Sequence, residues 1–175
     1  MKLTTKDMTE TAVMAALLCV LGPFSIPLGP VPLSLATLGV MLSVYILGTL
    51  KGTIACLIYL IMGAIGLPVF SGFSGGFAKI AGPTGGYLIG YIFLALIAGW
   101  FIQRFNDKIW MQFLGMCLGT AVLYAIGTVW LARVTGMTFS ESLAAGVIPF
   151  VAGDLIKIIV SIFLGRAVKK KLTAG

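Results

Sequence analysis

Six apolar runs, each about long enough to cross a lipid bilayer, take up most of this 175-residue chain. A transmembrane helix needs about 20 predominantly apolar residues. Only 10% of the residues are charged, whereas a soluble domain carries about 25%. The sequence therefore predicts an all-α, polytopic integral membrane protein with six transmembrane helices in one domain, residues 1–175. The expected spans are residues 8–24, 33–50, 52–66, 83–103, 109–134 and 146–168.

The basic residues predict how these helices are oriented. With a cytoplasmic N-terminus, nine of the twelve Lys and Arg fall on the inner side: Lys2, Lys6, Lys51, Arg104, Lys108, Arg166, Lys169, Lys170 and Lys171. Lys79 and Arg133 fall on the outer side, and Lys157 lies within the sixth span. Cytoplasmic loops carry an excess of Lys and Arg, so we expect both termini in the cytoplasm. The expected location is a cell membrane of bacterial type. The net charge of +7 is then a topology signal and gives no support to a nucleic-acid partner.

The three connections on the outer side, residues 25–32, 67–82 and 135–145, are longer than the inner ones. The first is rich in proline and the second in glycine, so neither is expected to form a regular helix. Such segments can cover a site that opens outward, or they can be ordinary linkers. Tyr87 and the phenylalanines of the second loop, Phe70 among them, could wall a pocket for a small apolar ring.

Asp154 and Lys157 stand out because both lie inside the apolar sixth span. A charge at the bilayer centre costs about 2.5–3.5 kcal/mol on insertion scales, so such residues usually mark a substrate or ion path. Three residues apart, they project from one face of the helix. Together they offer an acceptor beside a donor, which matches a ligand with an N–H next to a C=O, such as a urea or an amide. The alternative is an ion pair that only fixes helix packing.

Other kinds of site have little support in the sequence. There is no histidine and no P-loop motif, and Cys19, Cys56 and Cys117 all lie in apolar runs, so we expect no metal site and no nucleotide site in this chain. The stretch Gly72–Gly75 contains Ser74, and an intramembrane serine enzyme would need Lys79 or Lys157 as its base. A stand-alone secondary carrier in which Asp154 relays protons is a further alternative.

Small residues recur at four-residue spacing, which allows helices to approach closely in lipid. The glycines Gly86/Gly90 and Gly115/Gly119 are expected to serve packing inside the molecule. Ala12 and Ala16, flanked by Ala15, lie in the cytoplasmic half of the first span. This face could pack internally or dock a partner protein.

Three segments carry a resemblance to a known family: residues Pro30–Leu42, Gly66–Tyr91 and Gly153–Lys157. Together they resemble the BioY family, the biotin-binding S components of energy-coupling factor (ECF) transporters. The resemblance implies a subunit that captures biotin with high affinity and is not an enzyme. It also implies a transmembrane coupling subunit and two ATPase subunits as partners, so that ATP is used by those partners and this chain needs no cofactor.

The resemblance also assigns roles to residues. It implies that Asp154 and Lys157 hold the ureido ring of biotin, that residues 66–82 cover the pocket, and that the Ala12/Ala16 face docks on the coupling subunit. Family members commonly read SLQT where this chain has Ser34-Leu35-Ala36-Thr37, so Thr37 or Tyr45 is expected to compensate for the missing Gln. Ser71, Lys79 and backbone N–H groups of the loop are candidates for binding the carboxylate of biotin.

Overall fold

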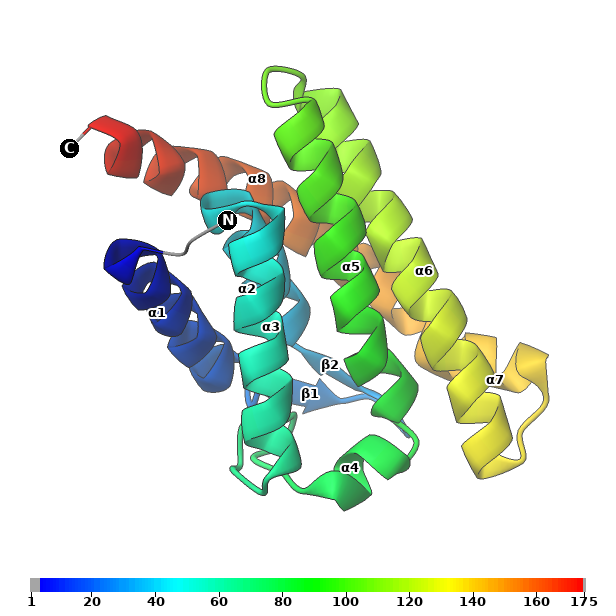
Figure 1. Cartoon of the computed structure of the whole chain (residues 1–175). Coiled ribbons are helices and arrows are strands. Elements are labelled where there is room, and N and C mark those ends of the chain that lie inside the picture. The colour runs from blue at the N-terminus through cyan, green and yellow to red at the C-terminus, as the bar shows by residue number, and fades with distance from the viewer. Residues whose placement is uncertain (1–3, 175) are drawn as a thin grey trace.

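The computed structural model describes residues 4–174, and side chains as far as Lys171, so Lys2 lies outside the described residues. The described chain is mostly helical, with one short β-hairpin (Figure 1). Its elements in order are α1 (Thr5–Leu21), β1 (Ser25–Pro27), β2 (Pro32–Ser34), α2 (Ala36–Leu47), α3 (Thr49–Ala64), α4 (Phe77–Ala81), α5 (Gly85–Arg104), α6 (Ile109–Thr135), α7 (Phe139–Gly146) and α8 (Ile148–Ala174).

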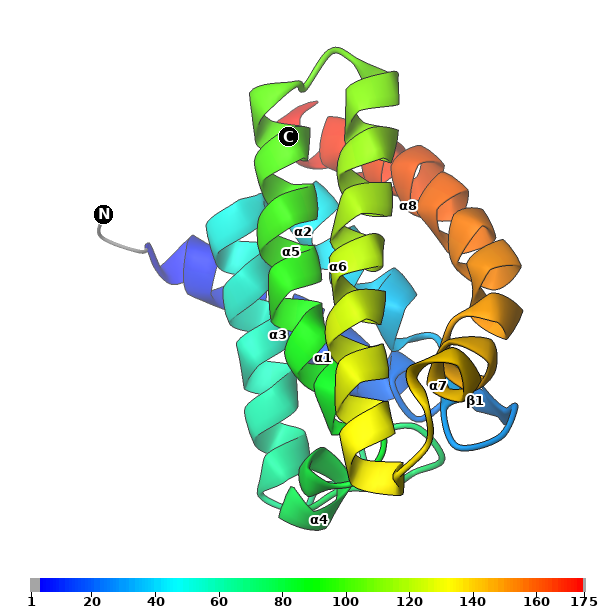
Figure 2. The ribbon, with the colours of Figure 1, turned by 90° about the vertical axis from the view of Figure 1, so that its right-hand side faces the viewer.

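The helices form one bundle in which α5 and α6 are an antiparallel pair joined by a short loop (Figures 1 and 2). Helices α3 and α2 pack against α5, and α1 packs against α3 and α2. Helix α8 packs against α2 and, less extensively, against α6. The hairpin, α4 and α7 all lie at one end of the bundle, and the α5–α6 loop and the C-terminus lie at the other. The two ends of the bundle are thus built from different kinds of segment.

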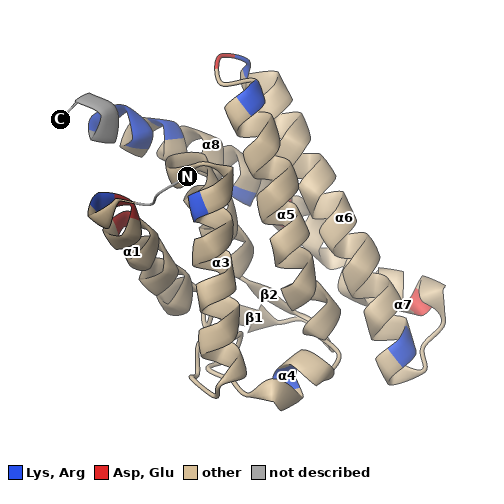
Figure 3. Ribbon diagram, viewed as in Figure 1, with Lys and Arg blue, Asp and Glu red and all other residues tan. Residues whose placement is uncertain are grey.

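Three helices are long and apolar enough to cross a membrane, over Gly85–Arg104, Ile109–Thr135 and Ile148–Lys171. Helices α2 and α3 are apolar but shorter, with 12 and 16 residues. Most Lys and Arg residues lie toward the end that holds the C-terminus, while α4 and the end of α6 carry one basic residue each at the opposite end (Figure 3). The chain is therefore a helical membrane protein with an uneven distribution of positive charge.

The outer connections contain more regular structure than we expected. Residues 25–32, expected to be an extended connection, form most of a hairpin in which Ser25 pairs with Ser34, so the second helix begins at Ala36 rather than near residue 33. The loop over residues 67–82 contains the short helix α4. The third connection contains α7, whose first turn is stabilised because Thr138 and Glu141 cap each other's backbone N–H groups.

Glycines allow the close approach of α5 and α6. A Cβ atom at Gly86 would lie 2.3 Å from the Cβ of Trp130, and one at Gly90 would lie 3.1 Å from the Cα of Leu123. Contacts this short leave no room for a side chain, so a larger residue at Gly86 would force the two helices apart. The close approach of α5 and α6 also fixes the positions of Tyr87 and Leu123, which belong to the same interface and line the cavity described below.

Lys51, near the start of α3, forms ion pairs with the first turns of α1. Its Nζ lies 2.8 Å from the carboxylate of Asp7 and 2.9 Å from that of Glu10. The hydrogen bond from Lys51, together with the capping contacts of Thr4, holds the pKa of Asp7 well below its usual range. The first turn of α1 is therefore fixed to α3 by charge as well as by packing.

Candidate functional site

A small cavity, partly open to the surface, lies where the hairpin, α2, α5, α6, α7 and α8 meet, and Asp154 and Lys157 of the sixth apolar run line it. Its volume is about 40 Å³. The lining residues are Val31, Pro32, Leu33, Ser34, Thr37, Tyr87, Tyr91, Leu123, Tyr124, Gly146, Phe150, Asp154 and Lys157. Four of the residues predicted from the sequence, Thr37, Tyr87, Asp154 and Lys157, are thus brought together in one place.

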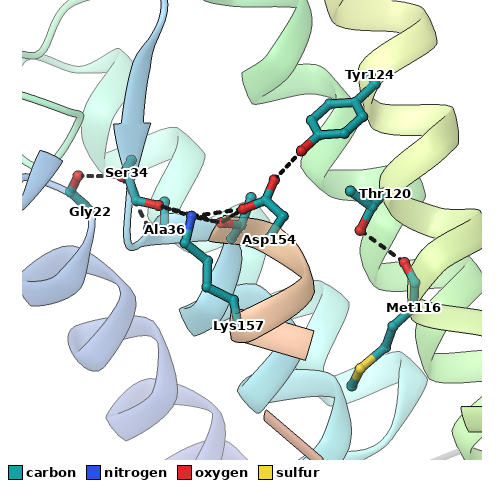
Figure 4. Close-up of polar contacts among 9 residues, drawn as sticks. Gly22, Ser34, Ala36, Met116, Thr120, Tyr124, Asp154 and Lys157 are labelled. Atoms are coloured by element: carbon teal, nitrogen blue, oxygen red, sulfur yellow. Dashed lines mark hydrogen bonds and ion pairs between the residues drawn. The ribbon is translucent and has the colours of Figure 1, made fainter. Parts of the chain in front are cut away.

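The Lys157 ammonium is the centre of the polar network (Figure 4). It donates to the backbone carbonyl of Ser34 at 2.7 Å, to the hydroxyl of Thr37 at 2.9 Å and to Asp154 Oδ1 at 2.8 Å. An ammonium has three N–H groups, so these three acceptors use all of them. Lys157 and Asp154 are only 8% and 4% exposed, which makes each bond costly to lose.

The Asp154 carboxylate is held from two sides. Its Oδ1 accepts from Lys157, and its Oδ2 accepts from the hydroxyl of Tyr124 on α6 at 2.5 Å (Figure 4). Hydrogen bonds to an ionised group are shorter and stronger than neutral ones. The carboxylate is therefore oriented by both α8 and α6, and a carboxylate with four lone-pair positions still has capacity to accept another N–H.

Ser34 anchors the cavity wall to the end of α1. Its hydroxyl donates to the carbonyl of Gly22 at 2.8 Å and accepts from the backbone N–H of Ala36 at 3.0 Å. These bonds fix the step from β2 into α2 and present the Ser34 carbonyl to Lys157 (Figure 4). The hairpin and α8 are thereby linked through one lysine.

The other walls are aromatic and aliphatic. The Tyr87 hydroxyl donates to the carbonyl of Gly146 at 3.0 Å, which joins α5 to the end of α7. Tyr91, Leu123 and Phe150, all buried, complete this side. The site thus combines an oriented carboxylate and ammonium with an apolar wall, a layout that suits a small ring carrying an N–H next to a C=O.

The structure places Tyr45 outside this cavity. Tyr45 lies eight residues after Thr37 on α2, about 12 Å along the helix, and its hydroxyl donates to Gln112 near the α5–α6 loop. Tyr45 therefore contributes to the opposite end of the bundle, and Thr37 is the residue of this pair that reaches Lys157.

The predicted loop residues also lie outside the cavity lining. Phe70 is fully buried, with its ring packed edge-on against Tyr59 at a centroid distance of 5.5 Å. Ser71 is partly buried in the turn that follows, and Lys79 is partly buried in α4. The Ser74 hydroxyl donates to the carbonyl of Ser71 at 2.8 Å, a contact within the turn.

Three cavity residues with polar side chains were not identified as site residues from the sequence: Ser34, Tyr91 and Tyr124. Tyr91 follows Tyr87 by four residues, so the helical period predicts that both face the same side. Tyr124 is a hydroxyl-bearing residue in the middle of an apolar run, where an interfacial position does not explain it. Ser34 acts mainly through its backbone carbonyl, which leaves no signal in the sequence.

Removing the Tyr124 hydroxyl tests how far the carboxylate depends on α6. In Tyr124→Phe, Asp154 Oδ2 loses its donor while it stays buried, and the expected loss of unfolding free energy is about 1–3 kcal/mol. The measurement is thermal unfolding in detergent. Tyr91→Phe is the matched control, because Tyr91 lines the same cavity but forms no hydrogen bond to Asp154 within the described residues. Equal stability of the two variants would contradict the role given to Tyr124.

Comparison with known proteins gives consistent matches over nearly the whole chain. The profile of the BioY family matches residues 1–174. The chain is 40% identical to the biotin transporter BioY of Rhizobium etli, covering 95% of this chain and 94% of that one. It is 37% identical to the biotin transporter BioY of Thermotoga maritima, with 94% and 96% covered. Among solved structures, the S component for biotin from an ECF-type ABC transporter superposes with a TM-score of 0.88 at 31% identity, covering 94% of this chain and 91% of that one.

Proposed function

This chain belongs to the BioY family, and on that basis we propose that it is the biotin-binding membrane subunit, or S component, of an ECF-type vitamin uptake transporter. The resemblance drawn from three sequence segments is thereby confirmed. The chain is a transport protein and not an enzyme, so the serine-enzyme alternative with Ser74 no longer applies.

One observation carries the assignment of the site: a buried carboxylate and a buried ammonium, 2.8 Å apart, line one cavity with an apolar wall. A ureido group presents N–H donors beside a carbonyl acceptor. Asp154 Oδ2 would accept from a ureido N–H, and Lys157 would donate to the ureido carbonyl. Because all three Lys157 protons are in use, the ureido carbonyl must replace one of the present acceptors.

The Ser34 carbonyl is the acceptor that is replaced at least cost. It is neutral, and the Thr37 hydroxyl lies 3.3 Å away as a second donor to it. Releasing Asp154 instead would separate a buried ion pair. Ser71 and Lys79 remain our candidates for the carboxylate of biotin. Helix α4, which carries Lys79, lies at the end of the bundle that holds the hairpin (Figure 1).

The direct test is a titration of the purified chain with biotin, followed by tryptophan fluorescence or heat. Saturable binding is expected, and a ligand that has the valerate tail but lacks the ureido ring should not compete. The choice of competitor isolates the recognition assigned to Asp154 and Lys157. Binding that depends on the tail alone would contradict the proposed site.

We propose further that α1, α2, α3, α5, α6 and α8 are six transmembrane spans in the cell membrane with both termini cytoplasmic. The uneven distribution of Lys and Arg supports this orientation (Figure 3). A cysteine introduced at Ser140, in α7, is expected to react with an impermeant thiol reagent added to whole cells, and one at Asn106 is not. The reverse labelling pattern would overturn the topology, and a background without Cys19, Cys56 and Cys117 provides the control.

The proposed partners are an ECF transmembrane coupling subunit and two ATPase subunits, which would use the ATP. On α1 the structure separates the small residues: Ala12 and Ala16 are exposed, whereas Ala15 is only 3% exposed and packs inside the bundle. An exposed pair of alanines four residues apart allows another helix to approach closely. The docking role therefore stays with Ala12 and Ala16.

A stand-alone proton-coupled carrier is supported less well. Asp154 is bonded to a lysine and a tyrosine at the same time, and a proton relay through its carboxylate would have to break these contacts. Biotin accumulation by this chain alone in liposomes with a proton gradient would establish that alternative.

A further inference from the structure

An apolar groove of about 450 Å³ runs between the first turns of α6 and the second half of α8. Trp110 and Phe113 line it from α6, and Ile159 and Phe163 line it from α8. Trp110 is 83% exposed and Phe163 is 72% exposed. The described part of the chain therefore leaves this groove open to the surroundings, and its one charged lining residue is Arg166.

Arg166 also lines a second cavity, of about 270 Å³, which is polar. Lys169 and Lys170 of α8 contribute two more positive charges to it, and Asp107 of the α5–α6 loop contributes its one acidic side chain. The apolar groove and this cationic cavity thus meet at a single residue. The segments that line them, namely the α5–α6 loop, the start of α6 and the C-terminal part of α8, lie toward the end of the molecule where most Lys and Arg residues are found (Figure 3).

The guanidinium of Arg166 is suited to an anion. Arg166 is exposed and forms no hydrogen bond or ion pair with the part of the chain that the structure describes. A guanidinium presents a planar set of donors that matches the oxygens of a phosphate. Its neighbour Lys169 already bonds Asn106 Oδ1 at 3.1 Å, so Arg166 is the residue we assign to the anion.

We propose that the groove and the cationic cavity together form a binding site for one anionic phospholipid, such as phosphatidylglycerol. An acyl chain would lie along Trp110, Phe113 and Phe163, and the phosphate would bind Arg166. Apolar surface that ends in net positive charge is complementary to a lipid tail that ends in an anionic headgroup. The site is separate from the biotin site, because Arg166 lies twelve residues beyond Asp154, about 18 Å along α8.

A lipid fits this surface better than a partner protein does. Helix α1, which carries the proposed docking alanines, and helix α6 lie on different sides of the bundle (Figures 1 and 2). Apart from Arg166 and the indole N–H of Trp110, the groove has no polar side-chain group that could pair with a protein backbone. The two helices that line the groove, α6 and α8, are both long enough to cross the membrane. The position of these helices in the bilayer therefore sets the depth of the groove.

Trp110 makes the site directly measurable. In a Trp100→Phe/Trp130→Phe background, Trp110 is the remaining tryptophan of the three, and its fluorescence reports bromine atoms on a nearby acyl chain. We expect brominated phosphatidylglycerol to quench Trp110 several-fold more than brominated phosphatidylcholine at the same mole fraction. Arg166→Gln should remove this preference. Lys171→Gln is the matched control, since Lys171 is an exposed cation of α8 that lines neither cavity, and it should keep the preference.

Three results would overturn the proposal. Equal quenching of Trp110 by both brominated lipids would mean that the groove holds membrane lipid without selecting its headgroup. A preference for phosphatidylglycerol that persists in Arg166→Gln would show that Arg166 does not bind the phosphate. Biotin binding by each variant provides the check on folding. If the double Phe background fails that check, native mass spectrometry of the chain with its own tryptophans should show retained phosphatidylglycerol that Arg166→Gln loses. Loss of all quenching in the assembled transporter would instead make the groove a protein interface and also overturn the proposal.

Discussion

Lys157→Met is expected to abolish measurable biotin binding and to lower the unfolding free energy by about 3–5 kcal/mol. The ammonium provides the proposed donor to the ureido carbonyl, and it neutralises Asp154, which is 4% exposed. Without it, Asp154 is left as a buried charge, and the Ser34 carbonyl and the Thr37 hydroxyl each lose a donor. Binding is measured by titration and stability by thermal unfolding in detergent.

Two further variants separate recognition from stability. Asp154→Asn loses the charge and keeps only one acceptor oxygen where Asp154 has one for Lys157 and one for Tyr124. Biotin binding should therefore weaken by about 1.5–3 kcal/mol, or about 10- to 150-fold. The double variant Asp154→Leu/Lys157→Met removes both charges, which usually restores stability at such positions. It should be more stable than Lys157→Met and still fail to bind biotin. Normal binding by Asp154→Asn and Lys157→Met would reduce the pair to a packing element.

Ala16→Trp is expected to abolish biotin uptake in cells while biotin binding by the isolated chain stays nearly unchanged. Ala16 lies on the exposed face of α1, so a tryptophan there does not disturb the core of the bundle. It would, however, prevent the close helix approach on which docking through small residues depends. Uptake of labelled biotin and titration of the purified variant are the two measurements.

Two alanines serve as matched controls for this prediction. Ala125→Trp adds the same bulk to an exposed position on α6, away from the proposed docking face, and should leave uptake intact. Ala15→Trp enlarges a residue that is 3% exposed, and binding should fall together with uptake because the bundle is disturbed. If Ala16→Trp behaves like Ala125→Trp, α1 does not dock the coupling subunit through this residue.

The sequence contained strong signals for the residues whose placement in lipid is costly. Asp154 and Lys157 stood out because an apolar helix rarely carries a charge, and the structure brings both into the cavity. Tyr124 could not be selected in the same way. Its contact with Asp154 depends on how α6 is rotated relative to α8, a property of tertiary packing that neither helix sequence specifies.

The differences between expectation and structure concern segments that have no strong hydrophobic periodicity. Tyr45 and Thr37 were equal candidates because both lie on one apolar helix, but only the first turn of α2 reaches Lys157. The prolines of residues 25–32 predicted an extended chain, which agrees with β1 and β2, but the pairing of the two strands depends on backbone partners and was not predicted. Ser71 and Lys79 lie outside the lining of the cavity, and Phe70 of the same loop is buried against Tyr59.

The volume of the cavity, about 40 Å³, governs how fast biotin can bind. Sites for small molecules usually measure about 300–1,000 Å³, so a bicyclic ligand can enter only after the hairpin or the aromatic walls have moved. Association then has two steps, an opening of the protein and the capture of the ligand. At high biotin concentration the observed rate of association should reach a plateau that equals the rate of opening of the protein. Diffusion of biotin to the protein would then no longer limit that rate. The same closure would slow the escape of the vitamin, so that a long residence time follows from the way the walls are packed.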